Sequence, residues 1–568
     1  MSKTFKNLPV GLQSFPKIIQ EQFFYLDKTD FIARMIDEKA GPYFLARPRR
    51  FGKSLLISTL AALFSGKREF FTGLAIEKRL DEKIFAARPV IRLDMSYVKT
   101  NIGFAEFYRT LGRMTSSSAI WQGSKWSLTR FLFASPKSFD FNPSAKLSPA
   151  EILTKLIEKL AKKSGRKVVV LIDEYDKPYL DLLNMPDEAE KVRDELRAFY
   201  TILKASDDHI SFTFITGISK FTRTGVFSAI NNIRDISVSP EYAALCGFTH
   251  DELARRFEKQ IDEAASKLGK NRDDLLEELR DYYDGFSFDG VTRVYNPFST
   301  LLFFVDKRFD NYWFDSGTSQ VIAQYIKDNR LTVEEFRGME VSRAFVKNPG
   351  EINNSGPESY LYQSGYLSVR AGKNENIYTL DYPNREVYES MSRLLVDNFI
   401  GNTAIADGAR INSLKAFENG DVNSLIKIFN ELLAKIPYDI YSNANRKTIK
   451  INNIEINFNE WLFHSNILSF LIGAGLDARA ENHTSHGQSD LVIIHGRRAW
   501  VLELKMVRNG NDATVAKTAL KQIMEKDYVG PYANPILLGI AINESKRTIS
   551  AWEAMDDETA KSQRGGSR

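Results

Sequence analysis

Residues 47–54, RPRRFGKS, bring together the residue types that bind a chain of phosphate groups. Gly52 would let the backbone approach the phosphates, Lys53 carries a point charge for the β- and γ-oxygens, and Ser54 offers a hydroxyl to Mg²⁺. The run follows apolar, strand-like residues and precedes a helical pattern, whose first N–H groups would point at the phosphates. It matches G-x-x-x-x-G-K-[ST] except that Arg47 stands at the first glycine, so we expect Pro48 to set the turn.

A second element, VVVLIDEYD (168–176), reads as a buried strand that ends in two carboxylates. Asp173 would hold the water shell of Mg²⁺, and Glu174 would polarise the attacking water. The alternative is that both acids merely mark the point where a buried strand meets solvent. The two elements in this order predict a site for ATP and Mg²⁺. The expected cofactor contacts come from Arg50, Gly52, Lys53, Ser54, Leu55 and Asp173.

Four other residues follow the acidic strand and have open interpretations. Thr216 or Ser219, at the end of the next strand-like run, would sense the γ-phosphate or would bond only to the backbone. Arg223 and Arg234 would be arginine fingers, in cis or in trans, or ordinary surface cations.

A different constellation stands near the C-terminus, in HGQSDLVIIHGRRAWVLELKMV (486–507). Asp490 opens one apolar strand, and a tight turn leads to a second strand that carries Glu503 and Lys505. Residues two apart in a strand share a face, so these two side chains point the same way. An antiparallel neighbour would bring Asp490 beside them. Two carboxylates then hold a hard divalent cation, and the lysine orients or activates water near a scissile phosphate.

Carboxylate and amide side chains around this block are candidates for the same site. Gln522, on a helix predicted over 519–528, would point toward it. Glu460 and Glu481 are either further metal ligands or solvated charges at a helix cap and a strand end.

Basic side chains and histidines near the block allow a structural interpretation as well. His464 lies among apolar helical residues, as a satisfied core histidine does, and His483 and His486 lack the spacing of a zinc site. Lys517, Lys521 and Lys526 would either hold a phosphate backbone or form a solvated helix face.

The order of the apolar runs predicts the elements that position these residues. Strand-like and helical runs alternate up to residue 239, as in parallel βαβ units, with a long insertion or loop over 114–148. Helical patterns follow, with Thr249 and Asn271 as N-caps, and then a hairpin signal around 365–382. We therefore expect a domain over 1–239, a helical lid over 240–340, a connector over 341–412, an α/β domain over 413–555 and a disordered tail over 556–568.

Composition sets limits on the class of protein. The 568 residues carry a net charge of +5, which neither requires nor excludes nucleic acid. The single cysteine, Cys246, forms no internal disulfide and is expected to be a small buried hydrophobe in a reducing compartment. Neither a signal peptide nor a run of about 18 apolar residues is present, so we expect a cytoplasmic protein without a membrane span.

The chain resembles a family of bacterial and archaeal proteins with an AAA-ATPase-like N-terminal domain and a C-terminal domain of the PD-(D/E)XK nuclease superfamily. Gln488 stands where that family usually has Arg, which removes a phosphate-binding or structural cation. The matching segments cover nearly the whole chain: FYLDKTDFI, FLARPRRFGKSLLISTL, VLIDEYDKP, FITGISKF, YDGFSF, VYNPFS, YWFDSGT, SGYLSV, YPNREV and the GQSD, LELK and QI block.

The resemblance implies a P-loop NTPase parallel sheet with a helical lid, a winged-helix-like connector and an α/β restriction-endonuclease-like domain. It also implies that Lys53 and Ser54 bind nucleotide and Mg²⁺, that Asp173 and Glu174 serve the metal and hydrolysis, and that Asp490, Glu503 and Lys505 form the nuclease triad. We expect ATP to control a nuclease that uses Mg²⁺ or Mn²⁺, acts on DNA and forms homo-oligomers. The alternative is an ATP-switched signalling or nucleic-acid-binding protein whose nuclease-like domain is inactive.

Overall fold

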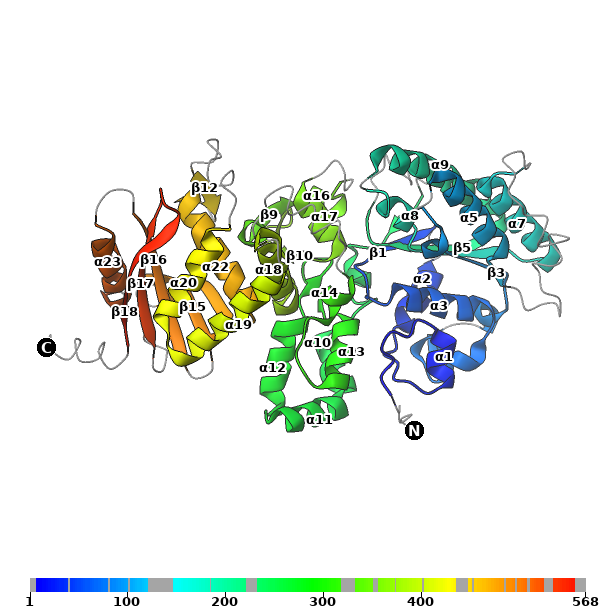
Figure 1. Cartoon of the computed structure of the whole chain (residues 1–568). Helices are drawn as coiled ribbons and strands as arrows, with labels where there is room; N and C mark the ends of the chain where they lie inside the picture. Colours follow the sequence, from blue (N-terminus) through cyan, green and yellow to red (C-terminus); the bar gives the residue numbers. More distant parts are fainter. Residues whose placement is uncertain are drawn as a thin grey trace. The chain divides into compact units, whose positions relative to one another are not determined.

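The computed structural model of the chain describes residues 7–38, 41–79, 82–100, 103–120, 147–183, 185–220, 232–317, 333–350, 356–372, 374–400, 403–435, 448–451, 454–484, 487–495, 498–507, 511–525 and 535–556. The chain divides into two compact units (Figure 1). The first comprises Met1–Val321 and Met339–Arg385, and the second comprises Ile322–Gly338 and Glu386–Arg568.

In the described part of the first unit, six strands form a sheet in the order β3-β2-β4-β5-β1-β6. All pairs are parallel except β2 with the short β3. The predicted parallel sheet is therefore confirmed, and β5 separates β1, which precedes the glycine-containing loop, from β4, which ends in the acids. The strands are β1 (Tyr43–Ala46), β2 (Val90–Asp94), β3 (Ala119–Ile120), β4 (Val168–Asp173), β5 (Ile210–Gly217) and β6 (Arg234–Asp235).

Helices cover both faces of this sheet, which explains why all six residues of β4 are buried. One face packs against α5 (Phe104–Ser117), α7 (Pro149–Ser164) and α9 (Pro186–Ala205), and the other carries α3 (Lys53–Phe64). α7 begins with a capping box of Ser148 and Glu151. The expected insertion over 114–148 begins too early, because α5 continues through Ser117 and β3 follows it. Residues 121–146 lie outside the described part.

Further helices lie before, between and after the strands of this sheet in the chain. Helices follow residue 249, in the segment that was expected to form a lid and keeps this name here. Both predicted N-caps are confirmed: the Thr249 hydroxyl accepts from the Glu252 N–H, and the Asn271 side chain accepts from the Asp274 N–H. The helices are α1 (Phe15–Gln20), α2 (Thr29–Glu38), α4 (Ala75–Arg79), α8 (Lys177–Leu180), α10 (His250–Arg256), α11 (Glu258–Leu268), α12 (Arg272–Tyr283), α13 (Pro297–Asp306) and α14 (Tyr312–Gly317).

The connector begins in the first unit with a three-stranded antiparallel sheet, β10-β11-β9, and two short helices. The predicted hairpin is β10 (Ser368–Ala371) with β11 (Ile377–Asp381), and β9 (Met339–Ser342) pairs with β11. The hydroxyl of Ser368 bonds to Ser287 of the hairpin of β7 (Phe286–Ser287) and β8 (Arg293–Val294), so the connector is anchored beside the lid. Its helices are α16 (Arg343–Lys347) and α17 (Pro357–Ser364).

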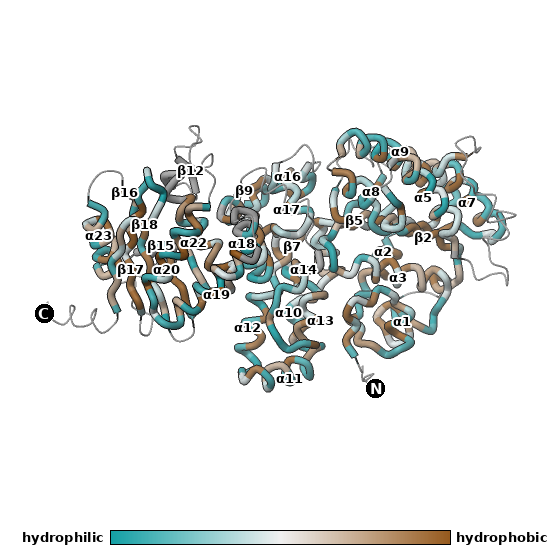
Figure 2. Tube along the Cα trace, viewed as in Figure 1, coloured by the Kyte–Doolittle hydropathy of each residue, from teal (hydrophilic) through white to brown (hydrophobic). Residues whose placement is uncertain are grey.

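The second unit is built on a five-stranded sheet in its described part, in the order β14-β15-β16-β17-β18 (Figure 1). The apolar strands β15–β17 form its centre (Figure 2). α19, α20 and α22 cover one face, and α23 packs on the other. The strands are β14 (Asp477–Thr484), β15 (Gly487–His495), β16 (Arg498–Val507), β17 (Ile536–Asn543) and β18 (Thr548–Met555), and a separate pair is β12 (Thr448–Ile451) with β13 (Ile454–Asn457).

The helices of the second unit begin earlier in the chain than the expected boundary at 413. Ala416 and Phe417 of α19 are buried in the core of this unit, and Tyr388 of α18 packs against it. The compact units therefore do not coincide with the expected segments at 341 and 413. The helices are α18 (Arg385–Ile400), α19 (Thr403–Asn419), α20 (Val422–Leu433), α22 (Phe458–Gly473) and α23 (Asp512–Glu525).

Among the described residues, no helix combines the length and the apolar character that a bilayer crossing requires. Of the expected tail, residues 557–568 lie outside the described part.

Candidate functional site

The loop between β1 and α3 has the backbone that its glycine predicts. Gly52 is the N-cap of α3 with φ of +84°, in the left-handed region that glycine adopts without strain. Arg50 has φ of +66°, which is unfavourable for a non-glycine residue. The loop therefore turns sharply twice and delivers Lys53 and Ser54 as the first residues of the helix.

Lys53 is only 6% exposed, and its ammonium group lies against the carbonyl oxygens of this loop. It donates hydrogen bonds to the carbonyl oxygens of Arg47 (2.9 Å) and Pro48 (2.8 Å). Burial lowers its pKa, while the nearby Asp173 and Glu174 carboxylates act in the opposite direction. A cation held by neutral carbonyls fits an incoming phosphate, which would supply the full negative charge that the loop lacks.

Arg47, at the first glycine position of the motif, has a structural role that the sequence did not reveal. Its guanidinium is fully buried and donates to the carbonyl oxygens of Ala46 (2.9 Å), Ser237 (2.7 Å) and Tyr242 (3.2 Å). It also lies 3.8 Å from the centre of the Phe288 ring. The expectation that Pro48 sets the turn is therefore incomplete, because Arg47 fixes the start of the loop to the segment that leads into the lid.

The acidic residues after β4 lie opposite the end of β5. Asp173 is 1% exposed and accepts a 2.6 Å hydrogen bond from the hydroxyl of Thr216. Glu174 has φ of +51°, so the strand ends at Asp173, and Glu174 lines the adjacent cavity. Burial raises the pKa of Glu174, and the neighbouring Asp173 carboxylate adds to this effect. A raised pKa suits a carboxylate that takes a proton from water.

A third acid, Asp176, was not singled out from the sequence, although DEYD contains it. It is fully buried and accepts hydrogen bonds from the backbone N–H of Ile218 (3.0 Å) and from both the N–H and the hydroxyl of Ser219 (2.6 Å each). Burial raises the pKa of Asp176. Thr216 and Ser219 thus bond to carboxylates and not only to backbone, and Asp176 holds the end of β5 against the acidic turn.

The two arginines considered as fingers have different outcomes. Arg234 forms an ion pair with Glu38 at 2.6 Å and a longer one with Glu241 at 3.5 Å. These contacts agree with an ordinary structural cation. Arg223 lies outside the described residues.

A cavity of about 690 Å³ opens beside the loop. This volume is typical of a small-molecule site. Its polar end is formed by the loop and the start of α3, with Lys177 and Glu174, and its apolar end by the chain before α2 and by the lid. The residues that line it include Arg50, Gly52, Lys53, Ser54, Leu55, Phe24, Tyr25, Leu245, Cys246, Phe248, Phe298 and Leu301.

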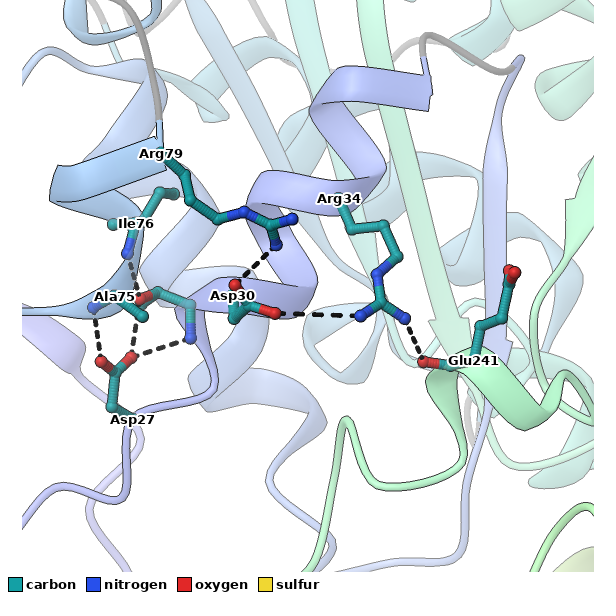
Figure 3. A network of polar contacts seen from close by, with 8 residues as sticks. Asp27, Asp30, Arg34, Ala75, Ile76, Arg79 and Glu241 are labelled. Atoms are coloured by element: carbon teal, nitrogen blue, oxygen red, sulfur yellow. Dashed lines mark hydrogen bonds and ion pairs between the residues drawn. The ribbon is translucent and has the colours of Figure 1, made fainter.

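A polar network fixes the wall that the chain before α2 contributes (Figure 3). The Asp27 carboxylate accepts from the N–H groups of Thr29 (2.9 Å) and Ala75 (2.7 Å), which joins the start of α2 to α4. Asp30 pairs with Arg79 at 2.6 Å, and Arg34 donates to the carbonyl of Glu241 at 3.1 Å. Phe24 and Tyr25, just before this network, are thereby held against the cavity.

The second constellation assembles as its spacing predicts. β15 and β16 form an antiparallel pair in which Leu491 lies opposite Leu502, so Asp490 lies opposite Glu503. The Asp490 carboxylate accepts from the Leu504 N–H at 2.7 Å, and Glu503 accepts from the Asp490 N–H at 3.4 Å. Each acid is therefore oriented by the other strand, on the face that α23 covers.

Glu503 is the centre of this cluster. It is 1% exposed, its Oε1 lies 3.0 Å from the Lys505 ammonium, and the Gln522 amide of α23 donates to it. Burial raises the pKa of Glu503, with a further contribution from Asp490, while Lys505 acts in the opposite direction. The expectation that Gln522 points to this site is confirmed. Two oriented carboxylates with an adjacent ammonium fit a hard divalent cation next to an anionic substrate.

The flanking candidates are resolved in part. His464 of α22 bonds to the Asp490 carbonyl oxygen at 2.7 Å, as a satisfied core histidine does. Lys521 is 72% exposed and pairs with Glu525 at 3.1 Å, and Lys517 is also exposed, so both belong to a solvated helix face. The side chains of Glu460, Glu481, His483, His486, Gln488 and Lys526 lie outside the described part.

Comparisons with known proteins match the two halves of the chain separately. Residues 9–227 match a family model described as a predicted AAA-ATPase, and residues 458–552 match the PD-(D/E)XK nuclease superfamily. A relative from Azotobacter chroococcum mcd 1, described as "Uncharacterized protein in vnfD 5'region", is 32% identical over 553 residues, which cover 96% of this chain and 98% of the relative.

A solved structure, the Aeropyrum pernix ORC2 protein in ADPNP–ADP complexes, matches 67% of this chain and 97% of its own. The identity is 10% and the TM-score is 0.24.

Proposed function

We propose that ATP binding controls a metal-dependent nuclease in this protein, because the chain belongs to the family that joins a predicted AAA-ATPase domain to a PD-(D/E)XK nuclease superfamily domain. The observation that carries the proposal is the buried Glu503 carboxylate, which Asp490, Lys505 and Gln522 contact together. Burial raises the pKa of Glu503, and carboxylates with such shifts beside a charged partner cluster at functional sites.

The nucleotide half of the proposal rests on the loop and the cavity. Lys53 would exchange its bonds to the Arg47 and Pro48 carbonyls for phosphate oxygens, and the Ser54 hydroxyl and Asp173 would hold Mg²⁺. Mg²⁺ supplies charge neutralisation at the phosphates. Glu174 would accept the proton of the attacking water. Arg50 and Leu55 line the phosphate end of the cavity. The apolar end would take the nucleoside.

The nuclease half rests on the cluster at β15 and β16. Asp490 and Glu503 would hold Mg²⁺, or Mn²⁺, which supplies charge at the scissile phosphate. The Lys505 ammonium would orient or activate the attacking water and attract the phosphate backbone. Gln522 would keep the Glu503 carboxylate in place when Lys505 moves from the acid to the substrate. The bond that breaks is a phosphodiester, and water supplies the new hydroxyl.

DNA is the proposed substrate, and ATP is the proposed switch. If ATP binding drives assembly, the nuclease cuts only in the assembled form. We therefore expect homo-oligomers whose formation depends on ATP. The single cysteine, Cys246, favours the cytoplasm as the location.

The test is cleavage of supercoiled plasmid and of single-stranded DNA by the full chain with Mg²⁺ or Mn²⁺, with and without ATP. We expect cleavage to disappear in Glu503→Ala and to change its ATP dependence in Lys53→Ala. Lys521→Ala is the matched control, because it removes an exposed lysine from α23 that contacts Glu525 and not the acids. Cleavage that persists in Glu503→Ala would refute the assignment of the site.

A second function is favoured by one observation. The carboxylate of Glu503 already has partners within the protein, the amide of Gln522 and the ammonium group of Lys505. This arrangement would also suit an ATP-switched signalling or nucleic-acid-binding protein without nuclease activity. No cleavage by any form, with ATP still hydrolysed and DNA still bound, would establish this second function.

A further inference from the structure

A cluster of aromatic side chains packs against the phosphate-binding loop from outside the cavity. We call Phe286, Phe288, Trp313 and Tyr366 the aromatic clamp. Phe51 of the loop is 1% exposed, and its ring centre lies 4.8 Å from that of Phe286 and 5.6 Å from that of Phe288. Trp313 joins the clamp through ring contacts to Phe286 (5.9 Å) and Tyr366 (5.1 Å). The clamp therefore links the loop to the lid-side hairpin, α14 and the connector.

The clamp also fixes the backbone of the loop. The indole N–H of Trp313 donates a 3.0 Å hydrogen bond to the carbonyl oxygen of Arg49. The described peptide bonds are trans, and a trans peptide directs its N–H opposite to its C=O. With the Arg49 carbonyl turned to Trp313, the N–H of Arg50 is directed away from the clamp. This single bond thus fixes the orientation of the peptide between Arg49 and Arg50 in the loop.

The connector reaches the same loop at a second point. Gly365 follows α17 with φ of +92°, and a Cβ built on it would lie 2.5 Å from Cγ of Pro48. Gln363 of α17 accepts a 2.7 Å hydrogen bond from the N–H of Lys220, which follows β5. The connector therefore packs against the loop and bonds to the segment that directly follows β5.

From the clamp the chain leads directly to the end of the first unit. The Pro383 carbonyl oxygen lies against Gly285, one residue before Phe286, so closely that a Cβ at Gly285 would be 1.9 Å away. The Arg385 guanidinium lies 5.4 Å from the Tyr282 ring centre. Arg385 is the last residue of the first unit, and α18 continues into the second.

We propose that Trp313 is a positioning residue of the nucleotide site, and that the aromatic clamp transmits the state of the phosphate-binding loop to residues 366–385. The inference rests on the proposed function, because it assumes that the loop binds ATP. It adds the route by which a bound nucleotide would alter the chain segment that enters the second unit. Trp313 is not among the residues that line the cavity, and it acts on the loop through the carbonyl of Arg49.

The test uses Trp313→Phe in the full chain, which removes the N–H donor and keeps an aromatic ring. Trp500→Phe is the matched control, because the Trp500 indole N–H is buried without a partner and its loss breaks no hydrogen bond. We expect Trp313→Phe to weaken the binding of AMP-PNP, measured by calorimetry, by about five- to tenfold. Its thermal midpoint should stay close to that of Trp500→Phe.

Hydrogen–deuterium exchange gives a readout that a merely structural role would not move. At saturating AMP-PNP, the wild type should show slower exchange both in the loop and in residues 366–385. Trp313→Phe should keep the first change and lose the second. An affinity within twofold of wild type, or a connector response that survives in the variant, would overturn the inference.

The failure of the proposed function looks different. If AMP-PNP neither binds the wild type nor changes exchange in the loop, the ATP site itself is wrong, and the inference falls with it. If the loop responds in the wild type and residues 366–385 do not, only the inference is wrong.

Discussion

The hydroxyl of Thr216 donates a 2.6 Å hydrogen bond to Oδ1 of Asp173, and both groups are buried. The bond connects the end of β5 to the end of β4, directly beside the strand that precedes Lys53. If Thr216 responds to a bound nucleotide, it must do so through its hydrogen bond to Asp173. The hydroxyl group of Thr216, and not its backbone, is therefore the group to remove by mutation.

Thr216→Val should separate this hydroxyl from the shape of the side chain. The variant leaves a buried carboxylate oxygen without its donor, which should lower the free energy of unfolding by about 1.5–3 kcal/mol. ATP hydrolysis should fall by about tenfold, because the Asp173 carboxylate loses its fixed orientation. Urea unfolding and phosphate release measure the two effects.

The controls for this prediction lie on the same residue and the same strand. Thr216→Ser keeps the hydroxyl and should retain most activity. Thr213→Val changes a buried threonine that lies opposite Val170, away from the acid. Equal losses in Thr213→Val and Thr216→Val would show that the Asp173 bond has no particular importance.

An uncharged residue in place of Arg47, at the first position of the loop motif, should destabilise the fold. Arg47→Met leaves the carbonyl oxygens of Ala46, Ser237 and Tyr242 without their donor, so we expect a loss of about 3 kcal/mol or more in the free energy of unfolding. Arg47→Lys keeps the charge but loses the planar group of N–H donors, so its free energy of unfolding should lie between those of the wild type and Arg47→Met. Arg47→Gly, which recreates the common motif, should be as damaging as Met; a more stable Gly variant in chemical denaturation would contradict this role.

Gly539 is predicted to be indispensable for the nuclease cluster. It lies opposite Glu503 in the β16–β17 pair, and a Cβ at this position would be 2.4 Å from Ala516 O and Leu520 N of α23. Gly539→Ala should push α23 outward, lower the free energy of unfolding by about 1–3 kcal/mol, and draw Gln522 away from Glu503. Calorimetric titration with Mn²⁺ should then show weaker binding.

Gly408→Ala is the control for Gly539. Gly408 lies within α19 of the same unit, and a Cβ there meets no atom within 4 Å. Alanine should therefore stabilise the helix by about 0.5–1 kcal/mol. A Gly539→Ala protein as stable as Gly408→Ala would mean that α23 does not need this close approach.

Asp284 should make stability depend on pH. It is 3% exposed, its Oδ1 has no hydrogen-bond partner, and burial raises its pKa, although Arg293, His250 and Arg280 act in the opposite direction. The folded state thus binds this proton more tightly than the unfolded chain, so its contribution to stability is lost as pH rises from about 4 through the raised pKa. Asp284→Asn should raise the thermal midpoint near neutral pH and lose this advantage near pH 4. An advantage that is the same at both pH values would exclude titration of Asp284 as the cause.

Much of the first unit could be predicted from local patterns. The run VVVLI is apolar at every position, a pattern that is typical of a strand covered on both faces of its sheet. All residues of β4 are indeed buried. The N-caps at Thr249 and Asn271 depend on residues three positions away, so the sequence holds all the necessary information. The Asp490–Glu503 pair was equally predictable, because a short hairpin leaves little choice of register.

What could not be predicted depends on long-range contacts. Nothing near Arg47 in the sequence indicates that its guanidinium bonds to Ser237 and Tyr242, 190 and 195 residues away. Asp176 and Trp313 were missed for the same reason, since their partners follow β5 or precede α3. The limits of α18 and α19 were missed because their membership of the second unit is decided by packing and not by helix signals.

The position of Cys246 has a practical consequence. This thiol is the single one in the chain, it lies in the wall of the cavity, and burial raises its pKa. A maleimide or iodoacetamide therefore attaches at one known place, slowly, and without any engineered mutation. Intact-mass spectrometry at fixed reaction times then gives the fraction of molecules that are modified at Cys246. A ligand that fills the cavity should lower this fraction. Labelling of the native Cys246 can therefore rank nucleotides and inhibitors by how well they fill the cavity, without an enzymatic assay.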